Sequence, residues 1–313
     1  MKEGAASFSS SGWRVSTAHF ISRILRNISI KGAGWLRQNL THWVAGSPQH
    51  PVVTSVEGGI QLLLHPKLDK GLESILYYHG SYELGTLDLI SKCLKPGDTF
   101  IDVGANIGLF SIYLSKNCPG INICAFEPLE STFTILEQNI EINQCANIKT
   151  FPYALGITND TGKITENLEL SRGSASMVGA ETSGRYEQMV HVQTLNDFVV
   201  KEGVDNIGLL KIDVEGWEQQ VLLGAGDLLG KRDAPIWVVE HNNTQKTEGA
   251  IPEEVYEYIL ATNEYTAFKS KGGKQLLSPL VPISSISELP INDNIFYLLP
   301  SHVEALPKAM FQP

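Results

Sequence analysis

Short apolar runs of strand length alternate with longer segments whose apolar residues recur at helical spacing. Seven runs are predicted as strands: Phe100–Val103, Ile121–Phe126, Ile148–Phe151, Leu209–Val214, Pro235–Val239, Thr266–Phe268 and Asn294–Leu299. Helical patterns follow most of them, and such βαβα order implies right-handed crossovers between parallel strands. The pattern therefore predicts an α/β fold, a seven-stranded sheet with helices on both faces.

The first predicted strand leads directly into a glycine loop. Asp102 ends the apolar run, Gly104-Ala105-Asn106-Ile107-Gly108 follows, and a helical pattern begins at once. A strand, a tight turn and a helix N-terminus form a site where backbone N–H groups and the helix dipole face a ligand. The GxxxG spacing differs from the GxGxxG of dinucleotide folds, and no Lys-Ser or Lys-Thr follows as in a P-loop. A glycine turn used only for packing is the structural alternative.

Acidic residues stand where several predicted strands end. Ligands of open parallel sheets lie outside these carboxyl ends, near the point where strand order reverses. Glu127 follows the loop by about twenty residues, where an acid can accept both hydroxyls of a ribose. Asp213 and Glu240 end strands that are successive in sequence. If those strands are neighbours, both acids meet at one cleft, with Glu215 and His241 beside them.

Two other charged residues need an explanation. Glu83 is predicted in the first turn of a helix, where it is either a dipole-favoured surface acid or a pocket carboxylate. Lys211 falls inside a predicted strand, and a buried lysine must be paired or lie near the strand end. We therefore expect Lys211 at the edge of the cleft with an acidic partner.

Residues 157–188 break the regular alternation. Small and polar residues dominate, as in Gly173-Ser174-Ala175-Ser176 and Ser183-Gly184. We predict strand fragments and a mobile loop that covers the substrate.

Residues 1–50 differ from the rest of the chain in charge. They hold six Lys/Arg and one acid, so the remainder holds 18 (24 − 6) against 33 (34 − 1), a net charge of −15. Within residues 13–44, apolar side chains recur at helical spacing with arginines interleaved, and Gly32 and Gly34 are predicted to divide the segment into two helices. The division into domains is thus a helical N-terminal segment, 1–50, and a catalytic domain, 51–313.

Two roles are open for this N-terminal segment. A basic amphipathic segment with tryptophans can lie at a membrane interface, which would give the protein a peripheral membrane contact. Alternatively the helices pack on the body or cover its pocket. Packing is favoured, because amphipathic helices mostly face a core.

Charge and cysteine content indicate which partners and which cellular compartment to expect. The acidic body argues against a nucleic-acid backbone as a partner. The four cysteines have no CxxC pair or metal-ligand spacing and are typical of a reduced, cytoplasmic protein. No signal peptide is predicted at the N-terminus, and no apolar run approaches the roughly 18 residues that span a bilayer.

Several motifs together resemble one enzyme family. FIDVGANIG, FEP, ALG and KIDVEGWE, with GSYE before the first strand and an acid–histidine pair after a later one, resemble the FkbM family of S-adenosylmethionine-dependent methyltransferases over about residues 75–245. The resemblance implies a Rossmann-like methyltransferase sheet and methyl transfer to a hydroxyl of a sugar, glycolipid or polyketide-like acceptor. It implies cofactor contacts at Glu83, Asp102, Gly104, Asn106, Gly108, Glu127, Pro128, Ala154 and Leu155.

The candidate acids suit this chemistry. A sulfonium donor is cationic, so the strand-end acids attract it. An alcohol has a pKa near that of water, roughly 15.7, and needs a base or a metal to lose its proton. Asp213, Glu215, Glu240 and His241 are the candidates. A metal-free base is favoured over Mg²⁺, because two firm carboxylates make a sparse metal site.

Two other functions share parts of this pattern. An NAD-dependent dehydrogenase would have the same sheet, but GxGxxG is absent. A non-catalytic S-adenosylmethionine-binding adaptor at membranes would keep the glycine loop and the basic N-terminus. It would need none of Asp213, Glu215 or Glu240.

Overall fold

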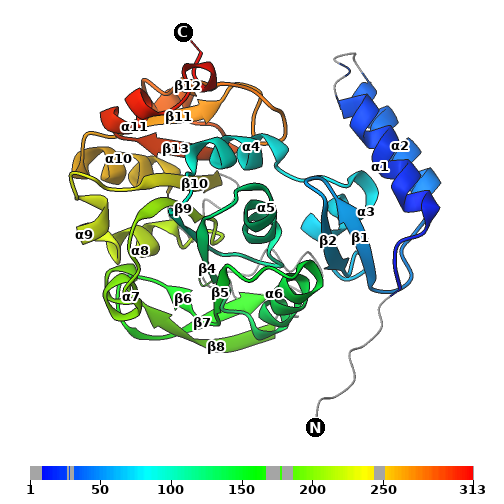
Figure 1. Ribbon diagram of the computed structural model, residues 1–313, viewed down its shortest axis with the longest axis horizontal. Coiled ribbons are helices and arrows are strands. Elements are labelled where there is room, and N and C mark those ends of the chain that lie inside the picture. Colours follow the sequence, from blue (N-terminus) through cyan, green and yellow to red (C-terminus); the bar gives the residue numbers. More distant parts are fainter. Residues whose placement is uncertain are drawn as a thin grey trace.

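A large mixed sheet forms the centre of the protein in a computed structural model, which describes residues 9–26, 28, 32–166, 177, 186–242 and 251–312 (Figure 1). Its strands lie in the order β12-β11-β13-β10-β9-β3-β4-β5. These strands are β3 (Thr99–Val103), β4 (Asn122–Phe126), β5 (Ile148–Phe151), β9 (Ile207–Ile212), β10 (Ile236–Asn242), β11 (Thr266–Ser270), β12 (Leu280–Pro282) and β13 (Asn292–Leu298).

The strands from β5 to β10 are parallel, and β13 is inserted antiparallel between β10 and β11. The seven predicted strands are all present. The sheet has an eighth, β12, a three-residue edge strand paired with β11. Because β3 lies between β4 and β9, the strand order reverses at β3, and a ligand site is expected at the carboxyl ends there.

Helices cover both faces of the sheet, as predicted. On one face lie α4 (Leu84–Cys93), α5 (Leu109–Asn117), α6 (Glu130–Asn143) and α11 (Pro300–Ala305). On the other lie α7 (Leu195–Glu202), α8 (Glu218–Leu223), α9 (Gly226–Leu229) and α10 (Pro252–Thr262). The architecture is the predicted Rossmann-like fold.

Alternation along each strand divides the core into two apolar clusters. Phe100 packs with α4 and α5, whereas its neighbour Ile101 packs with the helices of the opposite face. The same period of two decides which polar side chains can reach each face. Lys211 and Glu240 therefore share the α5 side, whereas His241 points to the other.

A small second sheet continues the fold beyond β5. It consists of β6 (Ala154–Leu155), β8 (Tyr186–Gln193) and β7 (Asp160–Glu166), in that order. The strand fragments expected within residues 157–188 correspond to β7 and the start of β8. The loop expected to cover the substrate, with Gly173–Ser176 and Ser183-Gly184, lies outside the described residues.

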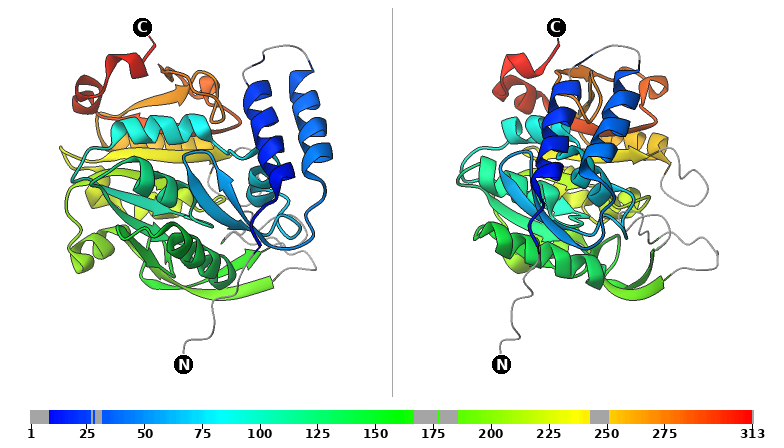
Figure 2. Two further views of the ribbon diagram at one scale, coloured as in Figure 1. Left: turned by 45° about the vertical axis from the view of Figure 1, so that its right-hand side comes forward. Right: turned by 90° about the vertical axis from the view of Figure 1, so that its right-hand side faces the viewer.

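A helical hairpin stands at the N-terminal side of the molecule (Figure 2). Its helices are α1 (Trp13–Arg26) and α2 (Ala33–Ala45), which confirms the prediction of two helices, although Gly34 lies inside α2. The hairpin packs on α3 (Leu72–His79) and on the strand pair β1 (Val52–Val56) and β2 (Ile60–Leu64). Among the described residues, no helix has the length and apolar character needed to cross a bilayer.

Candidate active site

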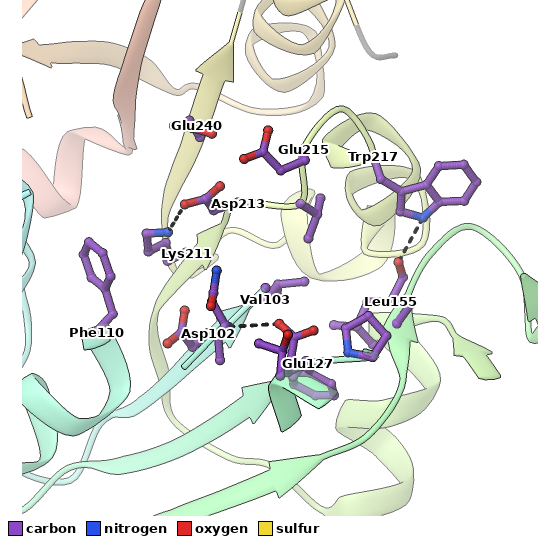
Figure 3. Close-up of a pocket in the computed structure, with 18 of the residues that line it drawn as sticks. Asp102, Val103, Phe110, Glu127, Leu155, Lys211, Asp213, Glu215, Trp217 and Glu240 are labelled. Carbon is purple, nitrogen blue, oxygen red and sulfur yellow. Dashed lines mark hydrogen bonds and ion pairs between the residues drawn. The ribbon is translucent and has the colours of Figure 1, made fainter. Parts of the chain in front are cut away.

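A pocket opens at the carboxyl ends of β3, β4, β9 and β10, where the strand order predicts it (Figure 3). It encloses about 1260 Å³ of space not filled by protein atoms, part of it open to solvent. Most of the predicted site residues line it: Asp102, Gly104, Asn106, Glu127, Pro128, Ala154, Leu155, Asp213, Glu215 and Glu240. Gly108, Glu83 and His241 do not.

The first glycine of the loop allows two strand ends to touch. Gly104 has φ +84°, and a Cβ there would lie 2.0 Å from the carbonyl oxygen of Asp213. Only glycine can adopt this backbone at such an approach without strain. The loop after β3 therefore lies against the end of β9, and the two halves of the pocket are held together at this point.

The loop does not offer its N–H groups to a ligand, contrary to the prediction. Gly104 and Ala105 both donate to the carbonyl oxygen of Phe126, Asn106 donates to Glu127, and Gly108 donates to Ala105. The N–H of Ile107 is bonded to the side chain of Asn106. Buried N–H groups are rarely left unpaired, and this tight turn pairs them internally. The loop lines the pocket as a shaped wall.

Gly108 has a structural role instead of the predicted ligand contact. It precedes α5 with φ +91°, and a Cβ there would lie 2.6 Å from Cδ1 of Leu136 in α6. The residue thus permits α5 to begin close to α6. Nothing in its position brings it to the pocket wall.

Glu127 is held firmly at the end of β4. Its Oε2 accepts the N–H of Asn106 and its Oε1 accepts the N–H of Leu129, both at 3.0 Å. The carboxylate is buried but still lines the pocket. A carboxylate fixed by two hydrogen bonds at this point provides a rigid acceptor beside the glycine loop (Figure 3).

Asp102 lies deeper, on the α5 side of β3. Oδ2 accepts a 2.6 Å hydrogen bond from the hydroxyl of Ser111. Burial raises the pKa of this carboxyl, while Lys211 on the neighbouring strand acts to lower it. Asp102 and Lys211 thus lie side by side at the floor of the pocket.

Three carboxylates gather at the other end of the pocket, at β9 and β10. Oxygen atoms of Asp213, Glu215 and Glu240 lie within 4.8 Å of one another. Register explains the meeting, because Ile212 pairs with Val239 on adjacent parallel strands and the residues that follow come side by side. The expectation that both strand-end acids reach one cleft is confirmed.

Glu215 is placed by the turn between β9 and α8. Its backbone has φ +51°, an uncommon conformation for a residue with a side chain. Oε1 of Glu218 accepts the N–H groups of Val214 and Gly216 at 3.2 and 3.1 Å and so fixes the turn on both sides of Glu215. Burial raises the pKa of Glu218 to about 7.

Two lysines, the buried Lys211 and the half-buried Lys274, balance the cluster. Nζ of Lys211 lies 2.7 Å from Oδ2 of Asp213 and 4.4 Å from the ring centre of Phe110, which confirms the expected acidic partner. Burial acts to raise the pKa of Asp213, but the ion pair with Lys211 outweighs it and the pKa falls below its usual range. Asp213 is therefore ionised at neutral pH.

Glu240 behaves in the opposite way. Burial and the adjacent Asp213 raise its pKa to about 9, although Lys274 acts to lower it. A side-chain hydrogen bond joins Asp213 and Glu240. Like charges this close cannot both ionise readily, so at neutral pH the pair holds one proton, on Glu240.

Lys274 comes from the segment between β11 and β12, and sequence reasoning missed it. Its Nζ lies 2.8 Å from Oε1 of Glu240 and 3.0 Å from Oε1 of Glu83. Glu83 Oε2 also accepts a 2.7 Å bond from Nδ2 of Asn294. Glu83 is therefore a buried support behind the pocket, and the prediction that it lines the cofactor site is corrected.

His241 is separated from the acids by the pleat of β10. It is buried on the opposite face of the sheet, where Nε2 lies 2.8 Å from the hydroxyl of Tyr297. Burial lowers its pKa to about 3. Because it neither reaches the pocket nor titrates near neutral pH, the prediction of His241 as a base is corrected.

Aromatic residues form the remaining wall. Phe126 and Tyr153 line the pocket, and so does Trp217, whose Nε1 donates to the carbonyl oxygen of Leu155 at 3.2 Å (Figure 3). Sequence reasoning did not select them as site residues, although Phe126 and Trp217 belong to the motifs FEP and KIDVEGWE and Tyr153 precedes ALG. Together they give an aromatic wall to the pocket.

The lining residues carry five acids (Asp102, Glu127, Asp213, Glu215, Glu240) and one lysine, Lys211. The pocket therefore favours a ligand with positive charge and an apolar part. The carboxylates of Asp213, Glu215 and Glu240 also have the oxygen donor atoms that a divalent cation prefers.

Two curated proteins and one solved structure show what the chain is similar to. Methyltransferase 1 of Beauveria bassiana (strain ARSEF 2860) is 29% identical over 160 residues, 44% of this chain and 64% of that protein. The 31-O-demethyl-FK506 methyltransferase FkbM of Streptomyces tacrolimicus is 30% identical over 189 residues, 52% of this chain and 71% of that protein. The structure of a SAM-dependent methyltransferase of Aquifex aeolicus is similar over 74% of this chain and 94% of that chain, with 15% sequence identity and a TM-score of 0.38.

A family model decides the assignment. The methyltransferase FkbM domain matches residues 102–270, which is 169 (270 − 102 + 1) of the 313 residues of the chain. This span runs from the acid before the glycine loop to the end of β11 and contains both strand-end acids of the cluster. The chain therefore belongs to the FkbM methyltransferase family.

Proposed function

We propose that the protein transfers a methyl group from S-adenosylmethionine to a hydroxyl group of a sugar, glycolipid or polyketide-like acceptor. The observation that carries the proposal is the Asp213–Glu240 pair, which holds one proton at the edge of a pocket suited to a cationic nucleoside. The name of the Streptomyces tacrolimicus relative, which refers to a 31-O-demethyl substrate, supports oxygen as the methylated atom.

The pocket fits the donor in its chemistry. Glu127 would hold the ribose hydroxyls, because it is a fixed acceptor beside the loop. The aromatic wall with Phe126 and Trp217 would pack against the adenine, and the acids attract the positive charge. When bound, S-adenosylmethionine supplies a methyl carbon on a positively charged sulfur.

The acceptor oxygen must lose its proton as it gains the methyl group. In the proposed reaction the O–CH₃ bond forms as the S–CH₃ bond breaks, the sulfur leaves as a neutral thioether, and Asp213 takes the hydroxyl proton. Asp213 is ionised and already points to the cluster, whereas Glu240 is protonated and donates to it. Holding the reacting groups in place supplies much of the acceleration.

A divalent cation is the alternative to the base. Asp213, Glu215 and Glu240 could offer oxygen ligands. However, Lys211 and Lys274 already place positive charge on two of these acids at 2.7 and 2.8 Å. A cation would have to compete with both lysines and remove the proton of Glu240, so the metal-free base is favoured.

Donor binding and methyl transfer test the proposal separately. Calorimetry should show binding of S-adenosylmethionine and no binding of NAD. Glu127→Ala should weaken the donor by about 1.5–3 kcal/mol, the worth of hydrogen bonds to a charged group. Unchanged donor affinity in this variant, or a preference for NAD, would contradict the cofactor assignment.

An acceptor screen with radiolabelled donor, read by product mass, should identify a methyl ether. Asp213→Asn and Glu240→Gln should lose most turnover while keeping donor affinity. If both retain near wild-type turnover, the shared-site mechanism is wrong. Chelator treatment should leave the rate unchanged for a base, whereas a rate restored by Mg²⁺ or Mn²⁺ would establish the metal alternative. An inactive protein that binds the donor normally would be an adaptor.

A further inference from the structure

The helical hairpin of α1 and α2 carries large aromatic side chains on its outside. Trp13 and Phe20 are 76% and 64% exposed on α1, and Trp35 and Trp43 are 70% and 77% exposed on α2. The other two tryptophans of the chain, at 217 and 237, belong to the catalytic body. Such a concentration of exposed rings marks an interaction surface.

The rings form a stripe along each helix. Trp13, Phe20 and Ile24 are spaced seven and four residues apart, so at about 100° per residue they lie within about 40° of one another. Trp35, Leu36 and Trp43 fall within an arc of about 100° on α2 by the same count.

Both stripes point away from the packed side of the hairpin. The buried residues of α1 are Val15, Ala18 and Ser22, roughly opposite its stripe, and those of α2 are Thr41 and Ala45. None of the residues that the structure describes between 13 and 45 lines the catalytic pocket. The hairpin therefore packs on the body with its small residues and leaves its large apolar ones outside.

Charge on the hairpin is of one sign. Residues 13–46 contain Arg14, Arg23, Arg26, Lys31 and Arg37 and no acid, whereas residues 51–313 have a net charge of −15. A negative surface would attract the hairpin and repel the body. The same surface must accept indole rings, which favours the interface of a bilayer, where tryptophan is enriched.

Two arginines of the hairpin belong to its packed side. Nη2 of Arg26 lies 3.3 Å from Oε2 of Glu57, in the turn between β1 and β2. By the same helical count, Arg26 and Arg37 fall on the sides of α1 and α2 that hold the buried residues. Arg23 is exposed and is free to approach a negative surface.

We propose that the outer face of the hairpin docks on an anionic phospholipid bilayer, with its aromatic stripes in the headgroup region and the exposed Arg23 beside the lipid phosphates. Helices of this composition lie in the interface plane with their apolar face about 5–10 Å deep. The acidic body is then held on the aqueous side. The surface would bring the enzyme to acceptors that are themselves lipid-linked or apolar.

Vesicle flotation of the full-length protein tests the proposal. The protein should bind vesicles that mix phosphatidylglycerol with phosphatidylcholine, and this binding should weaken at high salt. It should not bind vesicles of phosphatidylcholine alone. Replacing Trp13, Trp35 and Trp43 together by alanine should lower the partition coefficient by roughly tenfold or more, because apolar area drives insertion. The matched control replaces Met189, Val200 and Ile291, which are 64%, 82% and 69% exposed on the body, and should bind as the wild type.

A second pair of variants tests the electrostatic contribution to vesicle binding. Arg23→Gln should weaken binding about fivefold, the worth of one basic residue near an anionic surface. Arg232→Gln, exposed on the acidic body, should change nothing. Both arginines are exposed, so neither change should affect folding, and normal S-adenosylmethionine binding checks this independently of the membrane.

Three results would overturn the proposal. One is the absence of flotation at low salt, and another is equal binding to neutral and anionic vesicles. The third is a dimer, measured by sedimentation equilibrium, that dissociates in the triple tryptophan variant while no vesicle binding occurs. That result would assign the aromatic face to a second copy of the chain.

Discussion

Asp213 and Glu240 differ in charge because their neighbours differ, although both acids stand at strand ends in the same pocket. Lys211 bonds directly to Asp213, while Glu240 must share Lys274 with Glu83. Glu240 therefore has less compensating positive charge than Asp213, and it is the acid of this pair that keeps its proton. This arrangement provides an ionised acceptor and a proton donor within one hydrogen bond.

The raised pKa of Glu240 predicts how stability depends on pH. Because its pKa of about 9 in the folded protein exceeds the ordinary 4.5, protonation favours folding. That stabilisation is fully present below about pH 4.5 and is lost as pH rises to about 9. Glu240→Gln removes this titration.

Urea unfolding of Glu240→Gln and of the wild type at several pH values measures this effect. The free energy of unfolding of Glu240→Gln, relative to that of the wild type, should rise by on the order of 1 kcal/mol per pH unit between about pH 4.5 and 9. A difference that does not change with pH would show that Glu240 is ionised throughout.

Lys274 predicts a second effect at the residue scale. Lys274→Met leaves Glu83 and Glu240 without their shared cation, and removal of one partner of a buried ion pair costs about 3 kcal/mol or more. Chemical denaturation should show this loss, and adding Glu83→Gln should recover part of it. Lys271→Met, an exposed neighbour, is the control and should change stability by about 0.5 kcal/mol at most. Equal effects of the two lysine changes would remove Lys274 from the network.

The sequence predicts some site residues and not others for a physical reason. Asp102, Glu127, Asp213 and Glu240 directly follow or end apolar runs, so local pattern places them at one edge of a sheet. Lys274 reaches the cluster only through the pairing of β11 with β13, which no local pattern encodes. His241 was misplaced because one step along a strand turns a side chain to the opposite face.

At the scale of elements, the glycine loop sets the distance between β3 and β9. Gly104→Ala would place a methyl group against a backbone oxygen that cannot move without displacing β9. Gly203→Ala is a matched control, since Gly203 also has positive φ, +59°, but open space around it.

The control should lose about 1–2 kcal/mol for its backbone conformation alone. Gly104→Ala should lose at least about 2 kcal/mol more, through overpacking, and should weaken S-adenosylmethionine binding as well. Thermal unfolding and calorimetry measure both. Equal losses at the two positions would show that the contact with Asp213 can relax.

Strands and helices were predicted best where the pattern is long. The seven predicted strands each carry an apolar run, whereas β12 has three residues and no period that could be recognised. The role given to the loop N–H groups was wrong because sequence spacing identifies a turn but does not show how its backbone is paired. Pairing depends on Phe126 and Glu127, which lie about twenty residues away along the chain.

For the whole molecule, the hairpin and the pocket are separate units joined through α3. Gly71 and Leu72, at the start of α3, line the pocket, whereas Leu76 and Tyr77 contribute to the cluster under the hairpin. Deleting residues 1–46 should expose that cluster. The melting temperature should then fall by about 2–4 °C for each kcal/mol lost, while donor affinity should stay within about threefold because no lining residue is removed. A complete loss of donor binding would show that α3 depends on the hairpin for its position.

The insertion of β13 between β10 and β11 also bears on how the chain is completed during synthesis. β10 and β11 leave the ribosome first, yet they pair with β13 and not with each other. Until residues 292–298 emerge, the apolar edge of β10 has no partner, and an open edge of this kind invites pairing with other chains. Chains that terminate before residue 292 would therefore expose the unpaired edge of β10 to other chains, so completion of this sheet depends on β13.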